Sequence, residues 1–131
     1  MVTNLSMLED LYLRPAQINR LLLALMDEID HAQKELVMRT RDAVDKDRVY
    51  RAMFASELLK LKSVEGTVQD KKAAADGACD ETRFFAKLSE GLRESALEAV
   101  RNARSKLSAL QSIGANVRIE EELTRTPTPE F

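Results

Sequence analysis

Apolar residues recur every three or four positions along most of this sequence, and this spacing limits the fold more than any other feature. No proline occurs between Pro15 and Pro127, so no residue in this interval is a strong helix breaker. In the first half the spacing is continuous and matches one face of a helix, with two polar members near its middle. The series is Ile18, Leu22, Leu25, Ile29, Ala32, Leu36, Thr40, Ala43, Asp47, Tyr50, Phe54, Leu58 and Leu61. We predict one helix over residues 15–62, which would be about 70 Å long.

Residues 63–67 interrupt this pattern and indicate a turn. Gly66 is a typical helix terminator, and Thr67 followed by Asp70 resembles an N-cap with an acidic third residue. A second apolar series follows and gains strength along the chain. It consists of Phe85, Leu88, Leu92, Ala96, Ala99, Ala103, Leu107, Leu110, Ile113 and Val117. We predict a second helix over residues 68–122. We expect it to be nearly straight, because the steps are closer to an eleven-residue than to a seven-residue repeat.

Two long helices joined by a short turn must run antiparallel, and residue i of the first should face a residue at about 130 minus i of the second. The predicted fold class is therefore all-α, a long antiparallel helical hairpin or coiled coil. We divide the chain into an N-terminal arm over residues 1–14, the hairpin over residues 15–124 and a disordered tail over residues 125–131. A two-helix pair would leave part of the second helix wet, which favours a homo-oligomeric helical bundle or docking of the arm. The residues concerned are Phe84, Leu97, Val100 and Ile119.

The composition argues against several classes of protein. Aromatic residues are 5% and charged residues 32% of the chain, which is typical of long helices and not of all-β folds. His31 is the only histidine and Cys79 the only cysteine, so no catalytic triad, histidine-rich metal site or internal disulfide is supported. The four glycines are too far apart for a phosphate-binding loop. We predict a chain that is not an enzyme and holds no cofactor or metal.

The longest apolar run, residues 21–26, is far too short to cross a bilayer. The first ten residues also lack the basic start of a secretory signal. We therefore expect a soluble cytoplasmic protein that does not contact a membrane.

The net charge is only −2, but the charge is unevenly distributed. Residues 101–118 contain four basic residues and no acidic one, and they should face Asp27 and Glu28 in the hairpin. An earlier basic block should face Asp80, Glu81 and Glu90 and form ion pairs with them. This block consists of Arg39, Arg41, Lys46, Arg48 and Arg51. Residues 101–118 could be a solvated helix face with ion pairs inside the helix, or a surface that follows nucleic-acid phosphates when several copies align it.

Part of the sequence resembles a known family. The segment DKDRVYRAMFASELLKLK, the break at Gly66 and the closing LSALQSIGANVR are similar in layout to the UvsY-like phage recombination mediators, over about residues 36–119. Members of that family are small helical proteins that oligomerise, bind single-stranded DNA and help to load a recombinase past single-strand-binding protein. The resemblance implies DNA contact at the basic residues of the matching segments, with the last two secondary. These are Arg101, Arg104, Lys106, Arg118, Arg48 and Arg51. The family is more basic than this chain.

Two functional hypotheses follow. The first is an oligomeric accessory protein of phage-type DNA recombination or replication, which acts in the host cytoplasm on single-stranded DNA. Its partners would be a recombinase, an annealing protein or a single-strand-binding protein. The alternative is a helical scaffold or adaptor that binds protein only, as in virion assembly or a regulatory coiled coil. In that case the exposed apolar residues would form the interface.

Overall fold

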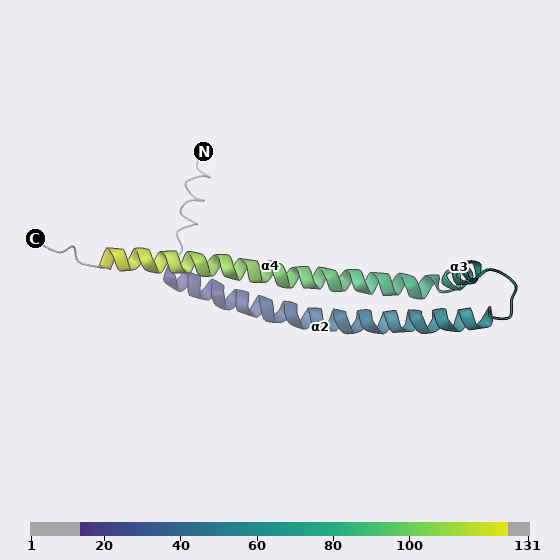
Figure 1. The fold of residues 1–131 in the computed structure, drawn as a ribbon. Coiled ribbons are helices and arrows are strands. Elements are labelled where there is room, and N and C mark those ends of the chain that lie inside the picture. The colour runs from purple at the N-terminus through teal and green to yellow at the C-terminus, as the bar shows by residue number, and fades with distance from the viewer. Residues whose placement is uncertain (1–13, 126–131) are drawn as a thin grey trace, which may run out of the picture. The chain divides into compact units, whose positions relative to one another are not determined.

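The computed structural model describes residues 14–125, and within this range all regular secondary structure is helical (Figure 1). Helix α2 spans Pro15–Lys60, α3 spans Val68–Ala78 and α4 spans Asp80–Arg125. The all-α prediction is confirmed, and α2 and α4 form the expected packed pair. Our expectations for an arm and a disordered tail concern residues that lie almost entirely outside the described range.

Local sequence accounts for the ends of α2. At its start the Arg14 N–H donates to Gln17 Oε1 at 2.9 Å, while Pro15 occupies a first-turn position that needs no donor. At its end the chain tightens into shorter turns, with Leu61 N–H donating to the Leu58 carbonyl at 3.1 Å. The helix therefore ends two residues before the predicted position.

The turn between α2 and α3 uses the residues that the sequence indicated. Gly66 has φ +147°, a conformation that strains any residue with a side chain. The Thr67 side chain caps α3 by accepting a hydrogen bond from the Asp70 N–H at 3.1 Å. The predicted terminator and N-cap are both confirmed.

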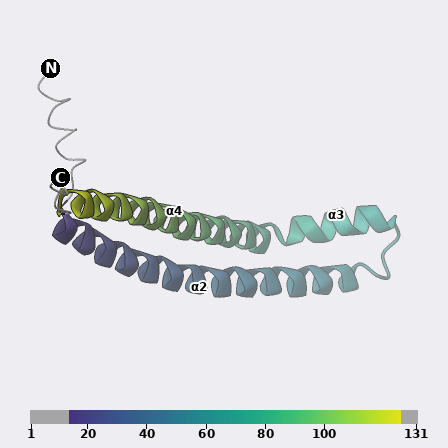
Figure 2. The same cartoon turned by 60° about the vertical axis from the view of Figure 1, so that its left-hand side comes forward.

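The prediction of a single helix over residues 68–122 is wrong, because Cys79 separates α3 from α4. Figure 2 shows α3 as a distinct helix set off from α4 by a bend. At the bend Cys79 has φ −103° and ψ 20°, and its N–H is shared between the carbonyls of Ala75 and Asp76. The Thr82 hydroxyl donates to the Cys79 carbonyl at 2.9 Å. An acidic first turn, Asp80 and Glu81, then suits the positive end of a new helix.

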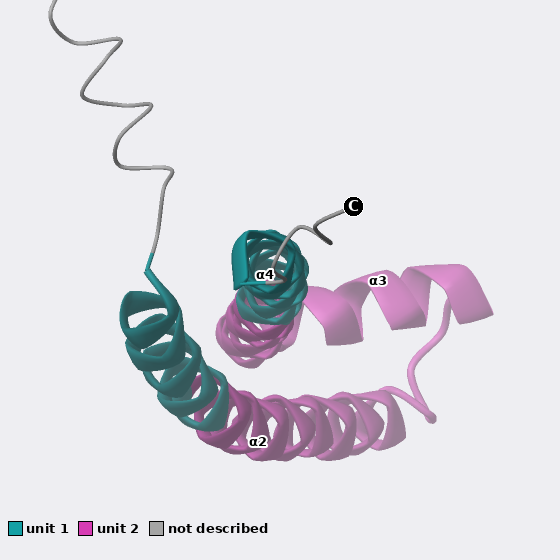
Figure 3. Cartoon of the chain, turned by 90° about the vertical axis from the view of Figure 1, so that its left-hand side faces the viewer, with its two compact units in different colours: residues 1–31, 101–131 teal, residues 32–100 magenta. Residues whose placement is uncertain are grey.

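The described chain divides into two compact units, coloured separately in Figure 3. The first contains residues up to His31 together with the segment from Arg101 onward. Here the two helices run antiparallel around Ile18, Ala103 and Leu110, all buried. The contact is close at Gly114, since a Cβ there would lie 3.3 Å from Ile18 Cγ2.

The second unit, residues 32–100, has a core of small side chains. Its buried residues are Ala43, Ala75, Cys79, Ser89, Ala96 and Val100. The Ser89 hydroxyl donates to Asp42 Oδ2 at 3.2 Å. The predicted antiparallel register places residue 41 opposite residue 89, so it differs from the observed pair by one position. Small residues let the helices approach closely but remove little apolar area from water.

The apolar series predicted for α2 is confirmed, because all of its members are buried or half-buried. Of the series predicted for α4, Ala96 is the one member in the second unit that is buried, and the prediction is wrong for the others there. Phe85, Leu88 and Leu92 are 43%, 47% and 37% exposed. The positions that are buried or half-buried there are separated by alternating steps of four and three residues. This is a seven-residue repeat and not the predicted eleven-residue one. They include Thr82, Ala86, Ser89, Arg93, Ala96 and Val100. Spacing alone could not show which side of α4 meets α2, since the larger apolar residues lie on another side.

Candidate functional site

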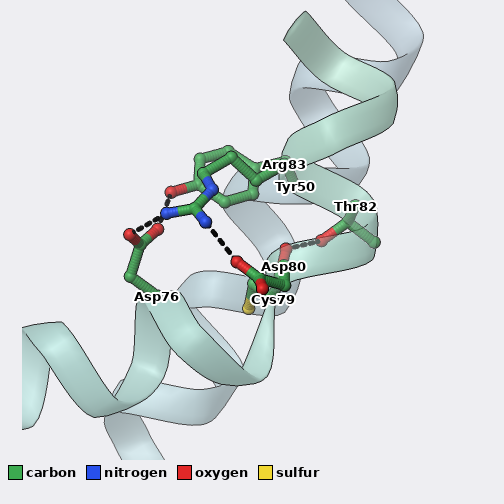
Figure 4. Close-up of polar contacts among 6 residues, drawn as sticks. All are labelled: Tyr50, Asp76, Cys79, Asp80, Thr82 and Arg83. Carbon is green, nitrogen blue, oxygen red and sulfur yellow. Dashed lines mark hydrogen bonds and ion pairs between the residues drawn. The ribbon is translucent and has the colours of Figure 1, made fainter. Parts of the chain in front are cut away.

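A three-helix polar cluster lies at the junction of α3 and α4 (Figure 4). Tyr50 from α2 donates its hydroxyl to Asp76 Oδ1 of α3 at 2.7 Å. Arg83, in the first turn of α4, forms ion pairs with both Asp76 and Asp80. Arg83 and Asp76 are each 35% exposed, so the cluster is only partly shielded from water. It joins α3 to α2 on one side and to α4 on the other.

The cluster fixes Tyr50 as a hydrogen-bond donor. The pKa of the Tyr50 phenol is raised, first by its hydrogen bond to Asp76, then by burial and by the charge of the same carboxylate. A phenol with a raised pKa stays protonated at neutral pH. Tyr50 therefore acts as a hydrogen-bond donor that links α2 to α3.

The spacing of the sequence placed Tyr50 in the apolar series of α2. The polar cluster was not predicted. The signal was available, because the predicted register places residue 50 opposite residues near 80, within about one helical turn of Asp76. Asp76, Asp80 and Arg83 also follow one another at steps of four and three, which brings them to one side of a helix.

The groove next to this cluster runs between α2 and α4 within residues 40–93 and has a volume of about 610 Å³. Ala43 and Ala86, which have small side chains, are among the residues that line it. Glu90 and Arg93 on its wall pair with each other, and this hydrogen bond lowers the pKa of the Glu90 carboxyl. Glu90 and Arg93 therefore neutralise each other on the wall of this groove.

A second groove, which we call the lysine groove, lies where the end of α2 meets α3. Its volume is about 430 Å³, and its lining combines apolar residues with three lysines. The lining residues are Ala55, Leu58, Leu59, Lys62, Val68, Lys71 and Lys72. None of these lysines forms an ion pair with another residue of the described range. The sequence did not predict the lysine groove, because the groove depends on how α3 packs against α2.

Cys79 is the most buried of the larger side chains in the described range. Burial raises the pKa of its thiol, and the nearby carboxylates of Glu57 and Asp76 raise it further. A thiol with a raised pKa contains little thiolate at neutral pH, so Cys79 packs as a small apolar residue.

The six basic residues proposed to contact DNA are all exposed, and they belong to both units. Arg101, Arg104, Lys106 and Arg118 lie on α4 in the first unit. Lys106 Nζ is 3.6 Å from Glu28 Oε1, which confirms the predicted proximity to that acidic residue. Arg48 and Arg51 lie on α2 in the second unit.

The expected ion pairs between the basic block of α2 and the acidic residues of the second helix are not those that the structure shows. Arg51 Nε lies 2.8 Å from Asp47 Oδ2, four residues back on α2. Asp80 pairs with Arg83, and Glu90 pairs with Arg93. Oppositely charged residues three or four positions apart on one helix are close enough to pair without contact between helices. These local pairs occupy the charges that we expected to pair between the helices.

No group of three His, Cys, Asp or Glu side chains between residues 14 and 125 is placed to hold a metal ion. No helix in that part of the chain is long and apolar enough to span a bilayer.

The chain matches no protein-family model, no curated protein and no solved structure.

Replacing Tyr50 by Phe should lower the free energy of unfolding by about 1 kcal/mol at neutral pH, since one hydrogen bond to Asp76 is lost. The phenol has a higher pKa in the folded state, so its stabilisation is complete below the pKa of the unfolded phenol. It disappears as the pH rises through the folded pKa. Urea unfolding of wild type and Tyr50→Phe at pH 7 and in alkaline buffer measures this difference. A difference that is the same at both pH values would contradict the assigned role.

Proposed function

We propose that this chain is a non-enzymatic helical scaffold that assembles with further copies of itself and holds protein partners along α2 and α4. The observation that carries the proposal is an inverted distribution of apolar size. Large apolar side chains on both helices are exposed, while half of the buried apolar residues in the described range are alanines. The most exposed include Leu23, Met38, Leu59, Phe84 and Leu123, at 67%, 65%, 70%, 61% and 72%.

Energetics favour covering these residues. Burying one Leu, Met or Phe side chain contributes about 1.5–3 kcal/mol, whereas burying Ala contributes much less. The total stability of a domain is only about 5–15 kcal/mol, so a few such residues covered by a partner would change it substantially. Association therefore offers this chain stabilisation that its own packing does not provide.

The character of the grooves supports a binding role over a catalytic one. Arg83 and Arg93 on the groove between α2 and α4 are engaged by carboxylates, and the pKa shift of Tyr50 keeps its phenol protonated. A nucleophile with an adjacent base, the usual arrangement for covalent catalysis, is not what this groove offers.

Light scattering tests the scaffold proposal. Wild-type protein at tens of micromolar should show a mass well above the 14.8 kDa of one chain. The variant Leu23→Gln/Met38→Gln/Phe84→Gln should show a lower mass with unchanged helical circular dichroism, because these side chains are mostly in solvent. As a control, Gln33→Ala, at an exposed polar site of α2, should retain the wild-type mass. A wild-type mass of one chain at every concentration would refute the proposal.

A second candidate function follows from the cationic side of α4. Arg104 and Arg118 are exposed and form no ion pair with any other residue in the described range. They are fourteen residues apart, so they lie on nearly the same side of the helix. Together with the resemblance to the recombination mediators, they support an assembly that binds single-stranded DNA beside a recombinase, an annealing protein or a single-strand-binding protein.

Titration of a fluorescent oligonucleotide distinguishes the two candidates. If the chain binds single-stranded DNA, the logarithm of the binding constant should fall by about 0.7 per phosphate contacted for each tenfold rise in salt concentration. Arg104→Glu/Arg118→Glu should then weaken binding at least about tenfold. A matched double reversal at exposed cations elsewhere, Arg20→Glu/Lys87→Glu, should have a smaller effect. Absence of binding at low micromolar protein in about 50 mM salt would eliminate direct DNA contact.

A further inference from the structure

We propose that the lysine groove binds the C-terminal end of α4 from a second copy of this chain, so that copies join head to tail. This inference rests on the scaffold proposal and specifies one of its contacts. The occupant is the exposed side of residues 119–123, which combines apolar and acidic side chains.

The groove has an apolar floor and a cationic rim. Leu58, Leu59 and Val68 provide apolar surface, with Leu59 70% and Val68 69% exposed. Lys62 and Lys72 are exposed on the rim and Lys71 is half-buried. The lining contains no acidic residue. A matching ligand would therefore present large apolar side chains between carboxylates.

The end of α4 has this character. Ile119 and Leu123 are 55% and 72% exposed, and their separation of four residues places them on one side of the helix. Glu120 follows Ile119 and Glu122 precedes Leu123, so a carboxylate lies on each side of the apolar pair. Glu121 is half-buried and belongs to another side of the helix.

Charge complementarity favours a second copy as the occupant of the groove. No ion pair in the described range neutralises the three lysines of the groove. The acidic run 120–122 lies in another segment of the same sequence. A groove of about 430 Å³ is large enough for two aliphatic side chains. The groove belongs to the second unit and the acidic segment to the first, so each copy carries both halves of the contact.

The geometry of this contact determines the type of assembly. Two different surfaces meet, so the contact is heterologous and leaves one unused groove and one unused helix end in every pair. Such contacts propagate unless the rotation closes a ring. One helix end in one groove buries less than the roughly 1,200 Å² of a stable complex, so each contact should be weak and reversible.

The position of α3 controls whether the groove exists. Val68, Lys71 and Lys72 come from α3, and the bend at Cys79 together with the Tyr50–Asp76 hydrogen bond holds α3 beside α2. The polar cluster therefore acts on assembly indirectly, through the shape of the groove.

Charge reversal with rescue tests the proposal. Lys62→Glu/Lys72→Glu and Glu120→Lys/Glu122→Lys should each reduce the light-scattering mass at a given concentration, with a loss of affinity of at least about tenfold. Mixing the two variants should restore a larger mass, because each provides the charge that the other now requires. A double reversal at exposed charges outside both surfaces, Arg20→Glu/Arg41→Glu, should change the mass little.

The outcomes separate this inference from the function on which it rests. A wild-type chain that stays at the mass of one copy would refute both. A wild-type chain that assembles, but whose two reversal variants assemble equally well or show no rescue on mixing, would refute only the head-to-tail contact. Helical circular dichroism of each variant, expected to match wild type because the altered side chains lie at the surface, excludes unfolding as the cause of a lower mass.

Discussion

Small side chains at the contacts between the helices govern the rest of this structure. Alanines at positions 43, 75, 96 and 103 bring the helices close together, and the larger apolar residues consequently remain on other sides. Ala43, one of these alanines, also lines the groove between α2 and α4. A fold built this way holds its shape along the helix pair but keeps much of its apolar surface available to partners.

The polar cluster around Arg83 adds a local constraint to this general one. It converts what would be a continuous second helix into two, and it ties α3 to a tyrosine 26 residues earlier in the chain. Because α3 is held beside α2, four apolar residues and two lysines of these helices line one groove together with Lys62 of the turn between them. The bend at Cys79 is thus the step at which a simple helix pair acquires a distinct binding surface.

Local signals in the sequence predicted the features that depend on local chemistry. The start of α2, the glycine turn, the Thr67 cap and the facing series of α2 depend on neighbouring residues or on one helix face, and all were predicted. The part of the α4 series in the second unit was not, because Phe85 and Leu88 are as apolar as any core residue and only the position of α2 shows that they are outside. The bend at Cys79 was also missed. No proline marks it, and hydrogen bonds and ion pairs within residues 75–83 stabilise it together with the Tyr50–Asp76 bond from α2, none of which follows from the spacing of apolar residues. Of the candidate sites, the exposed basic residues could be named from the sequence, but the lysine groove depends on packing between helices that no spacing rule predicts.

The central claim is that burial between copies supplements the stability of each chain. The most direct test is the thermal midpoint of unfolding, measured by circular dichroism from about 1 to about 100 µM protein. If assembly stabilises the folded chain, the midpoint should rise steadily with concentration, because mass action favours the associated state. A midpoint that stays constant across this range would show that the small-residue core is sufficient by itself, and would contradict the account.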